Sequence, residues 1–318
     1  LCGLMLIPIA LSFSSLSSRY DATGGSYLYA RDAFGPWVGF GIGWITWVMV
    51  IFSYAAVANA VSSYLAYFFN FFGSYAATKI VALGLIATLG VLNYIGIKPA
   101  ARTPDFFNIA KLIPLIVFLA IGIFFVDLGS FKPVSTQGLT NIGPAIFLAF
   151  FAFQGFEYVP VPSGESTQPK KDAPFAVIAS LLLCGTIYVL IQGVAIGTFP
   201  GLAGATQPLG QAGESFMGPW GASFIAAGAA ISTIGYTTGA ALVGPRYFYA
   251  LSVDGYVPGI FSRSHKTFKT PFASVALSTL AAAAAALFLD FDKLVDMTNV
   301  TVSFQYAATC LAAWKLSS

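Results

Sequence analysis

Residues 141–162 read NIGPAIFLAFFAFQGFEYVPVP, and this stretch decides the class of fold. An apolar run opens it, Gly155 follows between the polar Gln154 and the acidic Glu157, and two prolines close it. That order is typical of a transmembrane helix that breaks in the middle of the membrane. A broken helix frees backbone groups that lipid cannot satisfy, so the break is tolerated where it lines a cavity. We therefore expect a discontinuous helix whose first half ends near residues 151–153.

The composition of the whole chain indicates a membrane protein. Of its 318 residues 57% are hydrophobic and 8% are charged, and the mean hydropathy is +0.80. Stretches such as 80–91 and 112–125 are apolar on every face, whereas strands of a transmembrane barrel alternate apolar and polar residues. The sequence therefore predicts an all-α polytopic membrane protein that spans a lipid bilayer.

Hydrophobic runs between clusters of glycine, proline and charge predict nine spans. The chain begins inside such a run without an initiating Met, so we interpret it as a fragment. The nine spans lie near Leu1–Ser17, Gly35–Asn70, Tyr75–Ile95, Pro104–Val126, Asn141–Pro162, Ala173–Thr198, Met217–Ala250, Pro271–Leu289 and Lys293–Trp314.

Basic residues gather in alternate loops, and this predicts the orientation of the chain in the membrane. The loops after residues 17, 95, 162 and 250 are expected to be cytoplasmic because positive charge stays on that side, here of the cell membrane. The net charge of +3 reflects this topology and gives no sign of nucleic-acid binding. The basic residues of this face are Arg19, Arg31, Lys98, Arg102, Lys170, Lys171, Arg246, Arg263, Lys266, Lys269 and Lys315, and the other face has Lys79, Lys132 and Lys293.

Few side chains could support metal or covalent chemistry. The three cysteines each lie alone in a hydrophobic span, and His265 is the only histidine. One imidazole without partners builds neither a metal site nor a nucleophilic triad. We therefore expect no enzyme activity, no metal and no cofactor.

Two ionisable residues, Lys111 and Glu157, fall at membrane depth, where charge is costly and usually functional. Two interpretations of Lys111 are open: its side chain extends to the cytoplasmic interface, or it is a buried amine that takes up and releases a proton. The break near Gly155 likewise has two interpretations. It is a proline kink without a ligand, or it presents bare carbonyls and the negative end of a helix dipole to an ammonium group.

Four motifs in order resemble the amino-acid permeases of the amino-acid/polyamine/organocation superfamily. Residues 17–35 resemble the segment between that superfamily's second and third helices, and residues 150–157 resemble the unwound centre of its sixth helix. Residues 165–174 are similar to the loop that follows. Residues 246–258, with Thr270 and Pro271, look like the signature between its eighth and ninth helices.

The resemblance implies an inverted-repeat fold of five plus five helices, running here from the second helix to the tenth. Residues 1–126 would form the first repeat without its first helix, and residues 140–318 the second. It also implies secondary active transport of an amino acid by alternating access. An exchanger and a non-transporting amino-acid sensor of the same fold are the alternatives.

The resemblance also assigns roles to residues. Carbonyls of Phe151, Ala152 and Gln154 beside Gly155 would bind the substrate ammonium, with Phe153 and Phe156 as apolar walls or gate. Lys111 would replace a sodium ion and indicates proton coupling, with a proton as the coupled partner. The remaining candidates are Glu157 as a coupling or gating acid, Ser232, Thr233 and Thr237 as partners of the Lys111 amine, and Tyr306 as a gate or as packing.

Overall fold

The computed structural model describes residues 1–96, 109–131, 142–205 and 207–317. These residues form eleven α-helices and no strand. The prediction of an all-helical chain is therefore confirmed over this part. The helices are α1 (Cys2–Ser17), α2 (Ser26–Phe34), α3 (Pro36–Leu65), α4 (Tyr75–Ile95), α6 (Leu112–Gly122), α8 (Ile142–Ala152), α9 (Pro169–Thr198), α10 (Pro208–Met217), α11 (Pro219–Val253), α12 (Phe272–Phe288) and α13 (Phe291–Ser317).

Each of the nine predicted spans contains a helix, and α4 has the bounds that the sequence predicted. By length and composition α3, α4, α9 and α11 can each cross a membrane, and α1 and α12 are shorter apolar helices. Residues 104–108 and 141 of two predicted spans lie outside the described residues. The sequence did not predict α2 and α10, because neither is a long apolar run.

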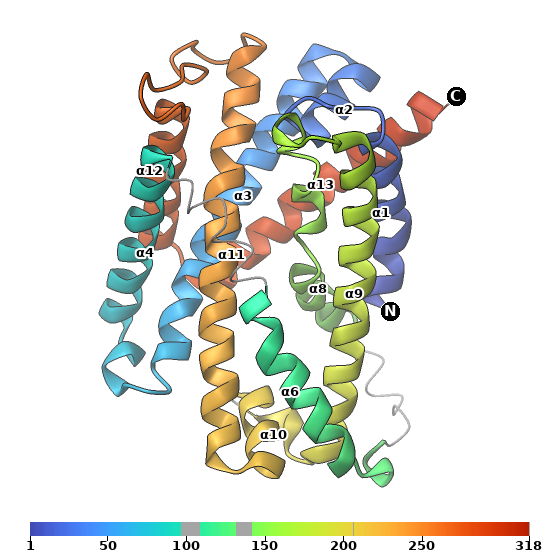
Figure 1. Cartoon of the computed structure of the whole chain (residues 1–318), viewed down its shortest axis with the longest axis vertical. Coiled ribbons are helices and arrows are strands. Elements are labelled where there is room, and N and C mark those ends of the chain that lie inside the picture. Colours follow the sequence, from blue (N-terminus) through green and yellow to red (C-terminus); the bar gives the residue numbers. More distant parts are fainter. Residues whose placement is uncertain (97–108, 132–141, 206, 318) are drawn as a thin grey trace.

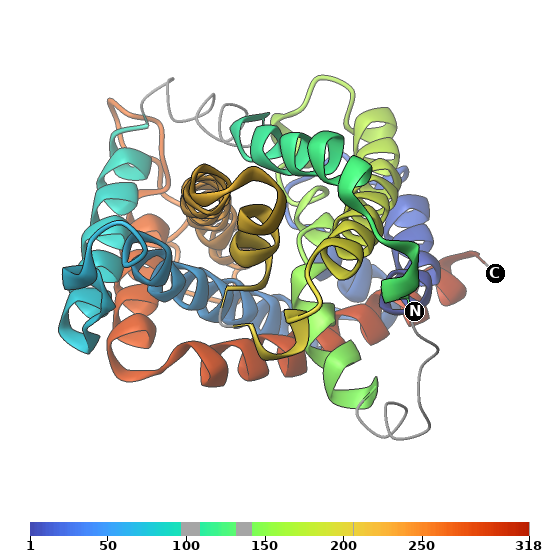
Figure 2. The same cartoon turned by 90° about the horizontal axis from the view of Figure 1, so that it is seen from below.

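The long helices α3 and α11 pack against each other in the middle of the molecule (Figure 1). On one side of them lie α4 and α12, which contact each other, and on the other side lie α1 and α9. Seen from below, α11 stands between the α4 and α9 sides (Figure 2). Helix α13 contacts α3, α2 and α1, and it therefore ties the two sides together.

Glycine lets α11 approach α6 closely. A Cβ added at Gly228 of α11 would lie 2.4 Å from Cγ of Pro114 in α6. Small residues at such crossings are typical of membrane helices, whose association depends on close packing. This crossing fixes the position of α6, whose first turn follows Lys111.

Successive long helices alternate in direction (Figure 1), as the span prediction requires. The segments 18–25, 163–168 and 254–271 lie at one end and 66–74, 199–205 and 207–218 at the other. At the first end the guanidinium of Arg31 in α2 and the hydroxyl of Tyr27 both bind the carboxylate of Asp254, which follows α11. These contacts bring together residues 17–35 and 246–258, two of the four segments that resemble the permease superfamily.

Lys79, which the sequence analysis counted on the second face, lies near the start of α4, close to segment 66–74. It is a residue of α4 and only 7% exposed. Its amine makes hydrogen bonds to carbonyls at the end of α12.

Candidate functional site

Helix α8 ends at Ala152, and a single 3-10 turn, Phe156–Tyr158, follows. Gly155 between them has a φ of +128°, a conformation that side-chain-bearing residues rarely adopt. A Cβ there would meet nothing within 4 Å, so backbone conformation and not space requires the glycine. The first half of the helix ends at the predicted residues, but 3-10 turns take the place of the expected second α-helical half.

Some carbonyls at the end of α8 already have donors. The Phe151 carbonyl accepts from the Gln154 N–H at 3.2 Å, and the Ala152 carbonyl accepts from the hydroxyl of Tyr188 at 2.9 Å. Within the described residues no donor reaches the carbonyls of Phe153 and Gln154. Carbonyl oxygens keep a second lone pair, so all four remain able to accept from a ligand.

The structure brings Glu157 and Tyr306 together. Glu157 is fully buried, and its Oε2 accepts from the Gly155 N–H at 2.8 Å and from the hydroxyl of Tyr306 at 2.9 Å. Its Oε1 has no donor in the described part of the chain. One oxygen of the Glu157 carboxyl group therefore binds the backbone N–H of Gly155 at the break. The other oxygen has no hydrogen-bond donor in the described residues.

Asn299 of α13 is a site residue that sequence reasoning missed. It is fully buried, its Nδ2 donates to the Phe147 carbonyl at 2.9 Å, and its Oδ1 accepts from Nε2 of Gln154 at 2.6 Å. One side chain therefore holds both α8 and the residue after its end. Asn299 lies seven positions before Tyr306, which places both on one face of α13. The signal that could have identified Asn299 is a polar amide in an apolar span, two helical turns before the candidate gate Tyr306.

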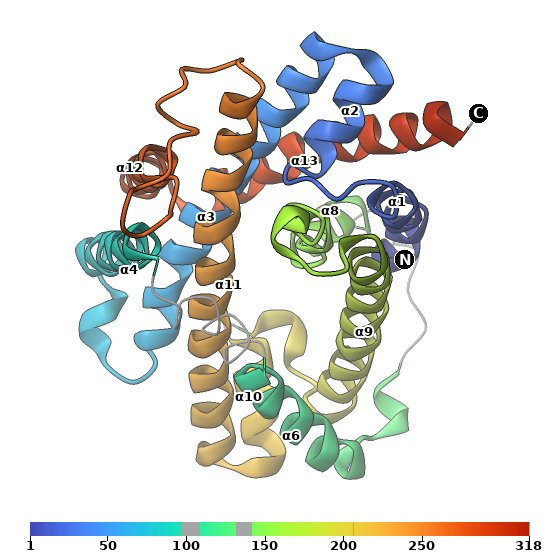
Figure 3. The ribbon, with the colours of Figure 1, turned by 45° about the horizontal axis from the view of Figure 1, so that its top comes forward.

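The predicted aromatic walls, Phe153 and Phe156, pack against different helices, Phe153 against α9 and Phe156 against α13. Helix α8 stands between these two helices (Figure 3). The Phe153 ring packs edge-on against Tyr188 of α9 at 5.1 Å. The Phe156 ring is 5.5 Å from Tyr306 and 5.8 Å from Phe13 of α1. The ring of Tyr306 therefore packs against Phe156, and its hydroxyl donates a hydrogen bond to Glu157.

Lys111 lies directly before α6 and is half-buried. No hydrogen bond joins it to the three candidate hydroxyls of α11 among the described residues. Thr233 and Thr237 donate instead to carbonyls of their own helix, at 2.9 Å and 2.7 Å. The third candidate, Ser232, is half-buried in α11.

A pocket of about 1010 Å³ lies between α6, α9, α10 and the segments around residues 127–130 and 199–203. Leu115 of α6, Tyr188 and Gln192 of α9, and Leu209 of α10 are among its lining residues. Tyr188 also donates to the end of α8, so this one side chain connects the pocket with the break. The described residues contain no group of three or more acidic, histidine or cysteine side chains that could hold a metal ion.

The alternating apolar helices, the broken α8 and its buried polar groups define a multi-pass membrane protein with a polar site inside its helical bundle. The family model described as Amino acid permease matches residues 1–318. The chain therefore belongs to the amino acid permease family, which is a family of transporters and not of enzymes.

Several relatives are transporters. The branched-chain amino acid permease BcaP of Bacillus subtilis (strain 168) is 27% identical over 312 residues, which are 92% of this chain and 66% of that protein. The serine/threonine exchanger SteT of the same organism is 26% identical, over 99% of this chain and 73% of the exchanger. The arginine/agmatine antiporter of Chlamydia pneumoniae is 28% identical, over 100% of this chain and 70% of the antiporter.

Proposed function

We propose that this protein carries an amino acid across the membrane by alternating access and binds the substrate ammonium at the break in α8. The observation that carries the proposal is a group of unpaired acceptors at that break. Buried side-chain oxygens of Gln154 and Glu157 lack donors within the described residues, and so do the carbonyls of Phe153 and Gln154. A buried acceptor without a donor is destabilising. A primary ammonium offers three donors and fits this set.

We also propose the inverted-repeat arrangement, with residues 1–126 in the first repeat and 140–318 in the second. The alternating direction of the helices supports it, and the basic segments at one end support a cytoplasmic location of that end. Phe153 and Phe156 cover the acceptors as walls or gate.

Proton-coupled symport is the mode of transport we favour. Glu157 is fully buried and shares a hydrogen bond with Tyr306, so a change in its protonation alters what holds the break. Lys111 would be the second residue of the coupling step. Exchange is the alternative candidate, because two of the relatives named above are an exchanger and an antiporter.

Uptake of a radiolabelled amino-acid panel into proteoliposomes containing the whole protein tests these proposals. We expect an inward proton gradient to drive uptake by the wild-type protein. In Glu157→Gln and in Lys111→Ala, uptake should no longer depend on the gradient. Counterflow that ignores the gradient would support an exchanger. Binding of amino acids without any flux would support a sensor and contradict transport.

A further inference from the structure

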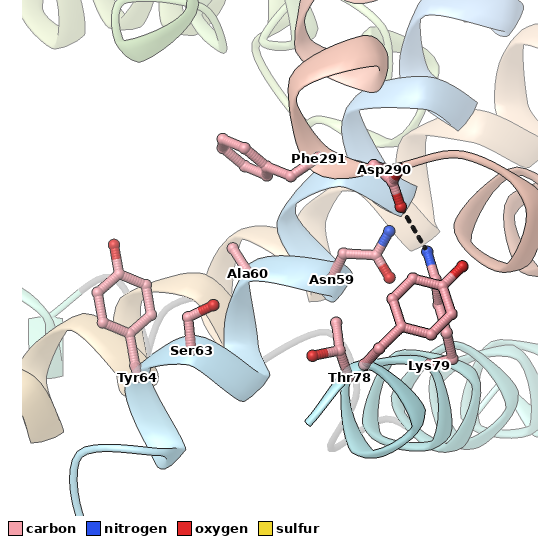
Figure 4. Close-up of a pocket in the computed structure, with 9 residues that line it drawn as sticks. Asn59, Ala60, Ser63, Tyr64, Thr78, Lys79, Asp290 and Phe291 are labelled. Atoms are coloured by element: carbon pink, nitrogen blue, oxygen red, sulfur yellow. Dashed lines mark ion pairs between the residues drawn. The ribbon is translucent and has the colours of Figure 1, made fainter. Parts of the chain in front are cut away.

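A second pocket, of about 330 Å³, lies away from the break, between α3, α4 and the segment that joins α12 to α13 (Figure 4). Its lining residues include Asn59 and Tyr64 of α3, Lys79 of α4, Asp290 of the joining segment and Phe291 at the start of α13. The pocket has one group of each charge, and neither the break nor Lys111 contributes to it.

The positive charge of Lys79 lies at the C-terminal end of α12, where it offsets the negative end of the helix dipole. Its Nζ donates to the carbonyls of Ala286 at 2.8 Å and Leu289 at 2.9 Å, and it lies 3.6 Å from a carboxylate oxygen of Asp290. The last carbonyls of a helix lack partners within the helix, and a cation there is favourable. Two of the three donors of Lys79 are therefore committed, which leaves it little capacity for a ligand.

Asn59 has an acceptor that nothing in the described residues satisfies. The side chain is 4% exposed, and its Nδ2 donates to the same two carbonyls at 3.3 Å each. Its Oδ1 is buried without a donor. Figure 4 shows Asn59 extending from α3 towards Lys79, beneath Asp290. The Asp290 side chain is 65% exposed, so its carboxylate is accessible at the same pocket.

The surroundings of the pocket suit a membrane interface. Tyrosine rings are typical of the level of the lipid headgroups, where their apolar body and polar hydroxyl both fit, and exposed phenylalanine rings offer apolar surface to lipid chains. The segment between α3 and α4 exposes several of them, and Tyr64, Tyr75 and Phe291 line the pocket itself. The exposed rings from the end of α3 to the start of α4 are Tyr64, Tyr67, Phe68, Phe69, Phe71 and Tyr75.

We propose that this pocket binds the primary ammonium group of an aminophospholipid such as phosphatidylethanolamine. The ammonium donates to Oδ1 of Asn59 and to the carboxylate of Asp290, and the lipid body lies against the exposed rings. A free amine has the same donors, but the rings at the pocket favour the lipid as their source. Phosphatidylcholine cannot take this place, because its nitrogen has no hydrogen to donate.

Native mass spectrometry of the purified full chain, mixed with equal amounts of phosphatidylethanolamine and phosphatidylcholine of identical acyl chains, tests the proposal. Hydrogen bonds to charged groups are strong enough that we expect roughly tenfold preference for phosphatidylethanolamine. Asn59→Leu and Asp290→Asn should each abolish this preference. Asp290 is largely exposed, so its variant tests the site even if Asn59→Leu fails to fold.

Asp292→Asn is the matched control, because Asp292 is an exposed aspartate two residues further on that does not line the pocket. It should keep the wild-type preference. Equal binding of the two lipids by wild type, or an equal loss in Asp290→Asn and Asp292→Asn, would overturn the proposal. Displacement of the lipid by millimolar ethanolamine would show that the site takes a soluble amine, which would overturn the lipid source.

Discussion

Replacing Tyr306 with Phe removes the one side-chain donor of the buried Glu157. The ring keeps its packing against Phe150, Phe156 and Phe13, so the variant tests the hydroxyl alone. Hydrogen bonds inside membrane proteins average about 0.6 kcal/mol and reach about 1.7 kcal/mol. Leaving a buried acceptor unpaired costs about 1–3 kcal/mol. Glu157 keeps the Gly155 N–H, so we expect a loss of about 1–2 kcal/mol, or 5- to 30-fold in the folded-to-unfolded ratio.

The assay is reversible unfolding of the purified protein in mixed micelles, with substrate binding measured on the same samples. Tyr54→Phe is the matched control. Tyr54 is equally buried at 3%, but its hydroxyl lies 3.5 Å from its nearest acceptor, the Ile86 carbonyl, which is at the limit of a hydrogen bond. Tyr54→Phe should therefore change the free energy of unfolding by less than about 0.5 kcal/mol. If both variants lose the same amount, the hydroxyl of Tyr306 does not support Glu157 and the reasoning is wrong.

Three further substitutions test the break and the helix crossing by the same unfolding assay. Gly155→Ala should lower the free energy of unfolding by about 1–3 kcal/mol, because a φ of +128° disfavours a residue with a side chain. Gly143→Ala in α8 is the control: a Cβ there also meets nothing within 4 Å, so the free energy of unfolding should not fall. Asn299→Leu should cost about 1–3 kcal/mol and weaken amino-acid binding, since it leaves Gln154 and the Phe147 carbonyl unpaired; unchanged binding would contradict its positioning role. Gly228→Ala should cost about 1–3 kcal/mol by forcing α11 away from Pro114, and Gly239→Ala on the same helix, with open space around it, is the control.

The sequence predicted the features that depend on the bilayer and on local conformation. The α4 span had its observed bounds because polar residues flank a long apolar run. The break in α8 was predicted because Gly155, the polar residues and the prolines act over a few neighbouring positions. Both signals are local, so one sequence was enough.

The features that sequence reasoning missed depend on contacts between distant segments. Asn299 looked like one of several polar residues of α13, and only the packing of α13 on α8 brings it to Phe147. The burial of Lys79 could not be predicted, because the carbonyls that accept from its amine are more than 200 residues away. The short helices α2 and α10 carry no long apolar run, so hydropathy could not detect them.

Helix α8 buries none of its side chains, although it ends at the candidate site. Ile146, Ala149, Phe150 and Phe151 pack only partly buried against the core, and hydrogen bonds from Asn299 and Tyr188 hold the helix in addition. At about 1 kcal/mol each, exchanging these hydrogen bonds needs less free energy than the roughly 4–8 kcal/mol released when a ligand binds with millimolar to micromolar affinity. The polar contacts that position α8 are therefore within reach of the free energy of substrate binding, while the fully buried faces of the long helices stay packed.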